Sequence, residues 1–394
     1  MPIASGVRCD LTYVAEVTRG TTPGSPTMKK LRTTSRNINL KKDMLKSQEV
    51  RSDRQISDVR HGFNKVDGSV GFELSLDAYK DMLQFALAGA FGGVTMQGIP
   101  PNFAVTVSAP NATIVRSVGD WVSDGFRVGM YITASTFTNP SNNGVFRVTA
   151  VTTLSLTIEN ASAVVQTSGA FGGVESAGHA SGSNGILKLG TTLSTFTMER
   201  RFTDVTKYQV FRGCAIGGGE LRVQPDSMVG GTLNILGMSS PVSSGTSLGT
   251  PTAAPTRSPF SAFDAALYEG GTLRTVVTGA TIKFDNKRTL KSVVGSKFSP
   301  DVFEGSAEVM VDLAALLEDT TLIDKFTNET ESSLYIRLNE LGSNYFMVVG
   351  FPRLKYVGGD IDPPQEGPII QQLPFQALVD PTWGTSMWVQ SYNV

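Results

Sequence analysis

The sequence has few of the residues that most often carry catalysis, bind metals or cross membranes. Its 394 residues include two cysteines, two histidines and three tryptophans. Two cysteines cannot build the disulfide framework of a small secreted protein, and they fit a chain that folds in a reducing compartment. The longest apolar runs, such as FALAGAFGGV, are too short to span a bilayer. The first residues, MPIASGVRCDLTY, also lack the charged and apolar regions of a signal peptide.

Charge is sparse and balanced. Charged residues make up 18% of the chain, and 34 Lys and Arg stand against 35 Asp and Glu. This balance gives no overall reason to expect tight binding to nucleic acid or to an anionic membrane. Hydrophobic residues reach 40%, which indicates a globular chain. The 41 glycines and the many Thr, Ser and Val residues favour a mainly β protein with many turns, and the length favours two or three domains.

The histidines and cysteines do not form a recognisable metal site. His61 and His179 are the only histidines, and neither has a second histidine or a cysteine at the spacing of metal ligands. Cys9 and Cys214 lie far apart in the sequence. We expect both to be small, buried hydrophobic residues.

Two short motifs resemble catalytic or phosphate-binding patterns but lack the residues or flanking structure that those patterns need. The run GTSLG around Ser247 matches the G-x-S-x-G pattern of a nucleophile elbow, which needs a sharp strand-to-helix turn. Its flanks, PVSS and TPTAAP, indicate neither strand nor helix, so we interpret the match as a coincidence. Gly217, Gly218 and Gly219 are not followed by Lys-Ser or Lys-Thr, so they form no P-loop and predict a β-turn or bulge. The sequence therefore predicts no enzyme and no cofactor.

An internal repeat organises the chain. The segments VDGSVGFELSLDAYKDML and FEGSAEVMVDLAALLEDT both read acid-Gly-Ser, then alternate as a strand, then take helical spacing. The shift from Gly68 to Gly305 is 237 positions. Asp77 and Thr320 are the predicted N-terminal caps of the two helices.

A second repeated pair reveals an insertion. KYQVFRG matches NYFMVVG, but the shift from Gly213 to Gly350 is only 137 positions. The first copy therefore carries about 100 additional residues, which is the size of a domain. Short strands separated by turns are predicted there, so we expect a small β-sandwich or barrel that projects from the main body. The predicted strands are FAVTVSA, ATIVRSV, VGMYITA, GVFRVTAV and LSLTIEN.

These observations predict a mainly β chain with two duplicated β-sandwich or barrel domains, each with a short flanking helix, and one inserted β-domain. The first domain is discontinuous and comprises residues 1–91 and 191–240, around an insert at residues 92–190. The second domain comprises residues 259–394. A Ser/Thr/Pro/Gly linker at residues 241–258 is expected to have no capacity to pack.

The segment SQEVRSDRQISDVRHG, Ser47–Gly62, alternates acids and arginines without apolar periodicity. A phosphate-binding arm would be basic, whereas this segment is balanced and suits directional contacts with another protein surface. The alternative is a solvated loop with internal ion pairs of little energetic worth. Its length favours the interface. The candidate contact residues are Glu49, Arg51, Asp53, Arg54, Asp58 and Arg60.

The run LRTTSRNINLKKDMLKSQEVRSDRQISDVRHG, followed by DGSVGFELSLDAY, resembles the tail tube proteins of tailed bacteriophages. The insert, with ATIVRSVGDWVSDGFRVGMYITA and NNGVFRVTAV, is similar to a small β-domain often carried by such proteins. The resemblance covers essentially the whole chain. It implies helix-flanked β-sandwich tube domains that form rings whose inner strands join into one β-barrel. Because this chain would hold two such domains, three chains would complete a pseudo-sixfold ring.

The resemblance also implies partners and a location. Long loops would supply the contacts between stacked rings, from Ser47–Gly62 and from Asn286–Val302, where the candidates are Lys287, Arg288, Lys291 and Lys297. The expected partners are the chain itself, tail-tip and tail-terminator proteins, and the tape-measure protein and double-stranded DNA in the lumen, without sequence-specific binding. The protein would be assembled in the host bacterial cytoplasm and reside in the virion tail, with no membrane partner. A projecting insert favours a non-contractile tail.

Two other functions stay open from the sequence. A surface-binding module would bind a receptor or glycan through exposed aromatic residues of the insert, for which Trp121, Phe126 and Phe137 are the candidates. A hydrolase would use Ser247 as its nucleophile. Which strand positions would face a lumen is not predicted.

Overall fold

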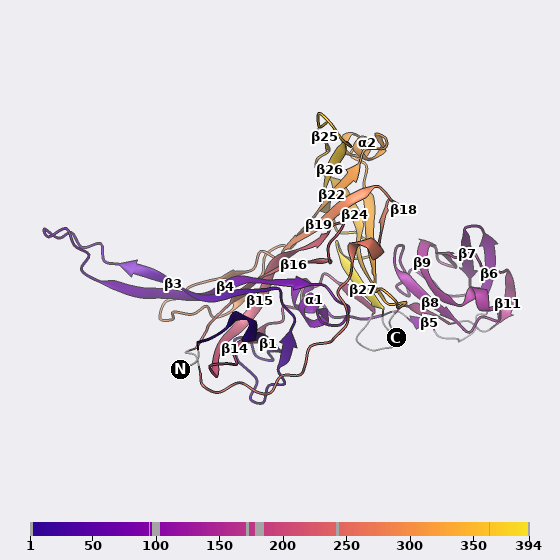
Figure 1. The fold of residues 1–394 in the computed structure, drawn as a ribbon. Coiled ribbons are helices and arrows are strands. Elements are labelled where there is room, and N and C mark those ends of the chain that lie inside the picture. Colours follow the sequence, from indigo (N-terminus) through magenta and orange to yellow (C-terminus); the bar gives the residue numbers. More distant parts are fainter. Residues whose placement is uncertain are drawn as a thin grey trace.

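The computed structural model describes residues 3–93, 95–96, 103–170, 173–177, 185–241, 244–361 and 363–392. Strands make up 49% and helices 7%, so the chain is mainly β, as predicted. The molecule is elongated, with a two-stranded arm at one end, the insert at the other and a β-sheet body between them (Figure 1).

The first half of the body is antiparallel. Its strands pair in the order β1–β14–β15–β16–β4–β3, and β2 pairs with the other edge of β1. The elements are η1 Gly6–Arg8, β1 Cys9–Ala15, β2 Lys29–Leu31, β3 Ser35–Lys46, β4 Val59–Glu73, α1 Lys80–Leu87, β13 Gly185–Lys188, β14 Phe196–Phe202, β15 Lys207–Val223 and β16 Gly230–Gly237.

The second half pairs its strands in the corresponding order, β17–β23–β24–β26–β22–β19. In both halves a helix follows the strand that forms the hairpin with the edge strand. The elements are η4 Ala262–Asp264, β17 Ala265–Glu269, β18 Thr272–Leu273, β19 Val277–Asp285, β20 Thr289–Leu290, β21 Val302–Phe303, β22 Glu308–Leu316, α2 Thr321–Thr327, β23 Ser332–Asn339, β24 Phe346–Tyr356, β25 Asp360–Ile361, β26 Ile370–Ala377 and β27 Trp388–Tyr392.

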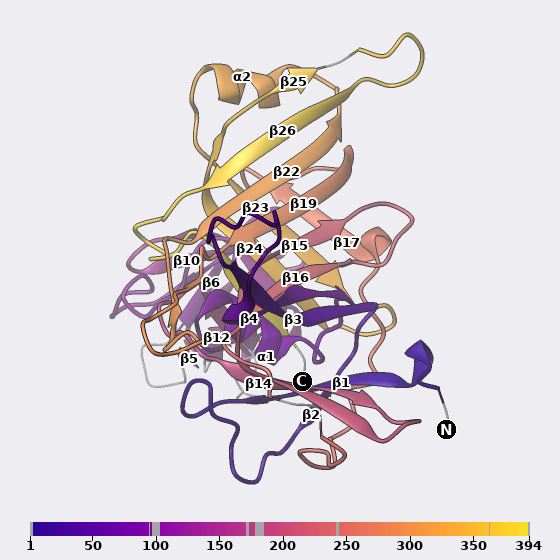
Figure 2. The same ribbon diagram turned by 90° about the vertical axis from the view of Figure 1, so that its left-hand side faces the viewer.

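The two halves join edge to edge. The end of β15 pairs with β19, with Gly218 opposite Asp285 and Val223 opposite Ala280. We call this pairing the internal junction. It makes one continuous sheet in the order β3–β4–β16–β15–β19–β22–β26, in which β25 and the end of β24 pair with the far side of β26, so that β3 and β25 lie at opposite ends (Figure 2). A shared hydrophobic core spans both halves on one side of this sheet.

The strand ladders of the two halves can be matched to each other, but not at the alignment that the sequence repeat suggests. Ile216 lies opposite Ile235, which lies opposite Gly68. The corresponding ladder in the second half joins Tyr356, Phe375 and Val311. Gly68 therefore corresponds to Val311, and the sequence alignment with Gly305 does not match the strand ladders.

The predicted helices are present, and their caps are partly wrong. The N-cap of α1 is Tyr79, while Asp77 makes an ion pair with Lys80 at 3.0 Å. Thr320 does stand at the N-cap of α2, but its hydroxyl bonds to the Asp324 carboxylate and to no backbone N–H. The carboxylate before α1 is therefore used for an ion pair and not for capping.

The insert contains every strand that the sequence predicted. They belong to a sheet with the order β11–β6–β7–β10–β9–β8–β12–β5. The elements are β5 Thr95–Met96, β6 Phe103–Ser108, β7 Asn111–Val115, β8 Tyr131–Ser135, η2 Pro140–Asn142, β9 Gly144–Val151, β10 Ser155–Glu159, β11 Gln166–Ala170 and β12 Gly173–Ser176. Trp121, Phe126 and Phe137 are buried in its core, so they cannot be the exposed aromatic residues that a surface-binding module would require.

The insert is anchored to the second half. Its hydrophobic core is continuous with Tyr335, Phe346 and Trp388. Arg127 Nε donates to the Thr382 carbonyl oxygen at 2.6 Å. The end of the insert that faces β24 and β27 is thus packed against the body, while the rest extends away from it (Figure 1).

The linker packs against the first half, contrary to expectation. Glu199 is fully buried and accepts hydrogen bonds from the Leu248 N–H at 2.7 Å and the Ser247 hydroxyl at 3.1 Å. Further along, Arg257 makes ion pairs with Asp77 at 2.8 Å and Glu340 at 2.7 Å. Polar bonds replace the apolar contacts that the linker composition cannot supply.

Candidate assembly surfaces

The arm is formed by the outer parts of β3 and β4 and the loop between them, residues 41–61. Every residue in this range is exposed, and the arm extends well beyond the body (Figure 1). Four of its apolar side chains are more than half exposed: Met44, Leu45, Val50 and Ile56. An extended, exposed hairpin with apolar side chains has little to stabilise it within one chain, so its surface suits a partner.

The predicted contact residues lie along this arm. Arg51 donates to both carboxylate oxygens of Asp53, with Nε–Oδ1 at 3.1 Å and Nη2–Oδ2 at 2.9 Å, and it lowers the pKa of that carboxyl. Arg60 pairs with Asp58 at 2.8 Å. Glu49 and Arg54 make no side-chain ion pair with the described residues. The loop is therefore ordered by internal pairs and still presents unpaired charges.

The second loop, between β19 and β22, is less exposed than its composition suggests. Lys291 and Lys297 are exposed, and Lys287 pairs with Glu308 at 2.7 Å. Arg288 is buried, and burial lowers its pKa. The Lys297 carbonyl oxygen accepts from the Asn64 N–H at 2.8 Å, so this loop lies against β4.

Asn286 and Arg288 stabilise the internal junction by hydrogen bonds to both α1 and β15. The Arg288 Nη1 donates to the carbonyl oxygens of Phe85 at 3.0 Å and Ile216 at 2.8 Å. The Asn286 Nδ2 donates to those of Ala86 at 2.8 Å and Ile216 at 3.0 Å. Both side chains thus bind the C-terminal end of α1. Sequence reasoning missed Asn286, because its partners are carbonyl groups far away in the chain.

The internal junction also explains the three consecutive glycines. The predicted bulge is present, because the register of β15 shifts between Ile216 and Gly218. A Cβ on Gly218 would lie 2.6 Å from the Phe284 carbonyl oxygen of β19. A second run, Val357 to Ile361, reads VGGDI and repeats GGGEL of residues 217–221 at the same place in the second half.

The side of the continuous sheet that faces away from the core is polar. We call it the polar face. Its charges are largely neutralised by neighbours: Lys283 pairs with Asp312 at 2.6 Å, Arg222 with Glu220 at 2.5 Å, and Lys41 with Asp67. The remaining positions are mostly small or uncharged: Asn37, Asn39, Ser69, Thr232, Asn234, Thr281, Gln372 and Gln376. A face of this kind has little net charge.

Both ends of the continuous sheet are free in the described part of the chain. There, β3 pairs only with β4, and β25 pairs only with β26. Exposed edges of this kind are templates for pairing with another chain. At the β3 edge, Arg200 Nη2 donates to the carbonyl oxygens of Arg36, at 3.4 Å, and Ile38.

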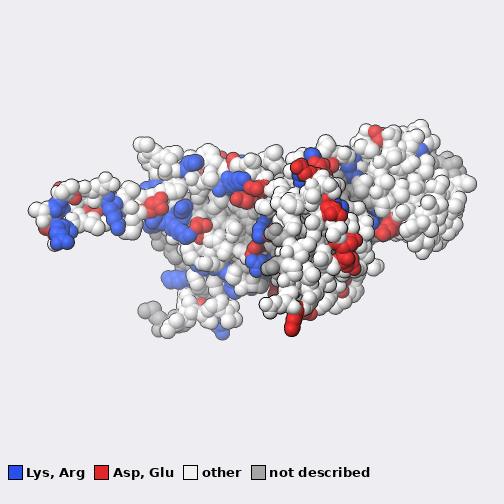
Figure 3. Space-filling model, turned by 90° about the horizontal axis from the view of Figure 1, so that it is seen from above, with Lys and Arg blue, Asp and Glu red and all other residues white. Residues whose placement is uncertain are grey.

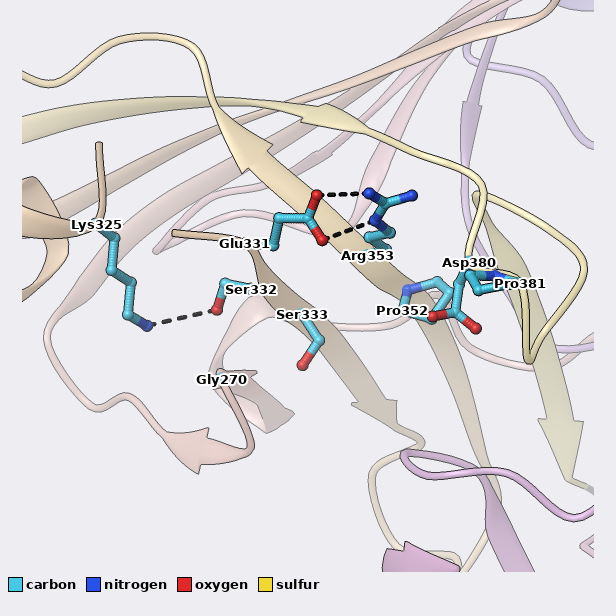
Figure 4. A pocket seen from close by; sticks show the side chains of 9 residues that line it. All are labelled: Gly270, Lys325, Glu331, Ser332, Ser333, Pro352, Arg353, Asp380 and Pro381. Atoms are coloured by element: carbon cyan, nitrogen blue, oxygen red, sulfur yellow. Dashed lines mark hydrogen bonds and ion pairs between the residues drawn. The ribbon is translucent and has the colours of Figure 1, made fainter. Parts of the chain in front are cut away.

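A surface hollow of about 780 Å³ lies beside α2 and is lined mostly by polar residues (Figure 4). Arg353 donates to both Glu331 oxygens at 2.6 and 2.7 Å, and the Asp380 carboxylate accepts from backbone N–H groups at 2.7 and 2.9 Å. Beneath it, buried Glu269 accepts from Lys325 at 2.5 Å and Ser332 at 2.6 Å. Burial raises the pKa of Glu269, but these hydrogen bonds outweigh burial and leave the pKa below its usual range. This cluster is satisfied within the chain.

Residues considered for catalysis do not come together. The Ser247 hydroxyl bonds to Glu199 and to the Gly249 carbonyl oxygen, and His61 lies on the arm. His179 lies outside the described residues. Cys9 and Cys214 are buried and unpaired, as predicted, and burial raises the pKa of the Cys214 thiol. Within the described ranges, no cluster of three His, Cys, Asp or Glu side chains could hold a metal ion. No described helix is long and apolar enough to cross a membrane.

Comparison with known proteins agrees with the resemblance found in the sequence. A family model described as phage tail tube protein matches residues 6–377, which is nearly the whole chain. No curated protein matches it significantly. Proteins of this family are structural components of the phage virion and assemble into the tube of the tail. The chain belongs to the phage tail tube protein family.

Proposed function

We propose that this protein polymerises into stacked rings of three chains, which form a hollow tail tube through which DNA is delivered. The observation that carries the proposal is the matching strand order of the two halves, joined edge to edge at the internal junction. Two such halves in one chain are consistent with duplicated tube domains, so three chains would supply six domains to a ring. Stacking of the rings is an open, heterologous assembly.

In this proposal the polar face lines the lumen. Its paired charges and small polar side chains would neither bind nor repel DNA strongly, because tight DNA binding requires an excess of basic residues. The tape-measure protein would occupy the lumen before DNA does. Tail-tip and tail-terminator proteins would meet the two ends of the tube. Assembly in the host cytoplasm is consistent with the two unpaired cysteines.

The arm supplies the proposed contacts between rings. It extends beyond the body and exposes apolar side chains together with unpaired Glu49 and Arg54. The second loop makes a shorter surface, with Lys287, Lys291 and Lys297 exposed and Arg288 used inside the chain. The contacts made by the two halves would therefore differ.

The insert is proposed as a decoration on the outside of the tube. Its visible surface carries few charged residues, and its aromatic candidates are buried (Figure 3). No observation on its described surface favours a receptor or glycan site. An outward position would leave no room for a contractile sheath.

Electron microscopy of the concentrated, purified protein tests the proposal. We expect hollow tubes with an axial repeat and outer projections at the insert positions. The proposal is overturned if the protein stays dispersed both alone and in the presence of the tail-tip proteins.

A further inference from the structure

The internal junction is a template for a junction between chains. The ladder of Ile38, Gly68, Ile235 and Ile216 crosses the first half. In the second half the equivalent ladder joins Ile282, Val311, Phe375 and Tyr356. Therefore β3 corresponds to β19, and the segment at residues 357–361 corresponds to the end of β15. At the internal junction β19 pairs with the end of β15. The corresponding edges of β3 and β25 have no partner strand among the described residues.

Side chains at the free β3 and β25 edges are more exposed than the corresponding side chains at the internal junction. Phe326, near the end of α2, is 40% exposed. Counting along the ladders, Lys42 and Met44 occupy the positions of Asn286 and Arg288. Lys42 and Met44 are exposed, although their counterparts are buried. Ile361 and Val357 are exposed as well. The free edges thus display the side chains that a strand partner would cover.

We propose that β3 of one chain adds to β25 and the end of β24 of a second copy, in the register of the internal junction. Since Leu221 lies opposite Ile282, Ile361 would lie opposite Ile38 of the other copy. Since Glu220 lies opposite Lys283, Asp360 would lie opposite Asn39. This inference rests on the proposed function and specifies which edges close the ring.

The junction between chains differs from the internal one in chemistry. Asn286 and Arg288 bind the end of α1 as buried hydrogen-bond donors. In their place the partner presents Lys42, a cation suited to the C-terminal end of α2. Near this end, Asp324 is exposed, and so is Glu329, which pairs with Lys355 at 2.7 Å. Ring closure is therefore more sensitive to salt than the fold of one chain.

In the free chain, the Arg200 side chain covers part of the β3 edge. It occupies the outward carbonyl oxygens of Arg36 and Ile38, which the partner strand needs. Its Nε is buried without a hydrogen-bond partner among the described residues, so the contact is incompletely satisfied. Pairing of β3 with a second copy displaces this side chain.

A disulfide between positions 39 and 360 tests the register. Their counterparts, Lys283 and Glu220, are directly opposite, and directly opposite residues in antiparallel strands have Cβ atoms about 4.5–5.5 Å apart, close to disulfide distance. Within one chain β3 and β25 lie at opposite ends of the sheet, so only chains in contact can form the bond (Figure 2). We expect Asn39→Cys combined with Asp360→Cys to give covalent trimers on a non-reducing gel.

The matched control is Ser35→Cys combined with Asp360→Cys, which moves the first cysteine about 13 Å along the same face of β3. It should stay monomeric under denaturing, non-reducing conditions. Absence of cross-linking in both double variants overturns the proposed pairing. If the wild type forms tubes at the same time, the proposed function stands without this junction.

A second pair of variants tests the edge without cysteines. Phe326→Asp places a charge on the exposed edge, and we expect a folded chain that no longer forms rings. Leu341→Asp is the control, because Leu341 is 82% exposed in the turn at the other end of β24. Rings of Phe326→Asp at wild-type yield would contradict the inference.

Discussion

Gly218 of β15 lies so close to Phe284 of β19 that a Cβ on the glycine would meet the Phe284 carbonyl oxygen at 2.6 Å. This approach is where the two halves become one sheet. A backbone oxygen cannot move aside as a flexible side chain can. The glycine is therefore required by the neighbouring strand, and not by a turn.

Replacing this glycine should loosen the internal junction. We expect Gly218→Ala to lower the free energy of unfolding by about 1–3 kcal/mol, because the strands must separate locally to admit the methyl group. Chemical denaturation measures the change. Gly245→Ala is the control, since its added Cβ would have no neighbour within 4 Å. Equal stability of the two variants would show that the junction tolerates the methyl group.

Gln390 fixes the insert to the body. It accepts from the Tyr131 N–H at 2.9 Å and donates to the Tyr131 carbonyl oxygen at 2.8 Å, with no solvent exposure. Gln390→Leu would leave both backbone groups buried and unpaired. We expect a loss of about 2–4 kcal/mol, and faster hydrogen exchange in β8. The exposed Gln372→Leu should leave both unchanged; if Gln390→Leu behaves in the same way, the anchor is elsewhere.

Glu269 should make the second half sensitive to acid. Its folded pKa lies below the usual value, so its contribution to stability is present above about pH 4.3 and is lost as the pH falls through the folded pKa. At pH 7 we expect Glu269→Gln to cost about 3 kcal/mol, because Lys325 and Arg274 lose their buried partner. Thermal melts from pH 3 to 7 should show the difference from wild type shrinking at the acid end. Glu331→Gln, at a half-exposed ion pair, should change little at any pH. A pH-independent difference for Glu269→Gln would contradict the assignment.

The arm should matter for assembly and not for folding. Because residues 41–61 are exposed, replacing Arg51 and Arg54 by Glu should leave the melting temperature unchanged. We expect the variant to form no stacked tubes by electron microscopy, and Arg8→Glu, an exposed arginine outside both loops, to form them normally. Normal tubes from the double variant would remove the arm from the inter-ring contact.

Arg200 should delay assembly. Arg200→Met keeps the apolar stem against Phe211 but frees the β3 edge, so we expect a shorter lag before polymers scatter light. The wild-type lag at equal protein concentration is the reference. An unchanged or longer lag would mean that Arg200 does not guard the edge.

Local patterns in the sequence predicted local structure well. The period-2 segments before α1 and α2 and the strands of the insert are where the sequence placed them, because alternation reports burial of one strand face directly. Long-range pairing was not predictable in this way. Arg288 reads as an exposed basic residue, yet its partner Phe85 is 203 positions away. Trp121 likewise follows the polar run Gly119-Asp120 and still lies in a core.

The packing of the polar linker was also not predictable from local patterns. Its composition predicts no packing, but the buried carboxylate of Glu199 gathers its backbone and hydroxyl groups. Hydrogen bonds to a buried charge can order a segment that has no apolar periodicity. No sequence pattern marks Glu199 or Asn286 as a residue that orders another segment. The repeat of GGGEL as VGGDI, in contrast, is a sequence pattern that marks corresponding strand ends in the two halves.

The most direct test of the account is the number of chains in one ring, measured by cryo-electron microscopy with helical averaging. We predict three chains per ring, with a near-sixfold inner barrel in which β15–β19 and β25–β3 junctions alternate. Rings of six chains, or an inner wall in which β3 is unpaired, would contradict it.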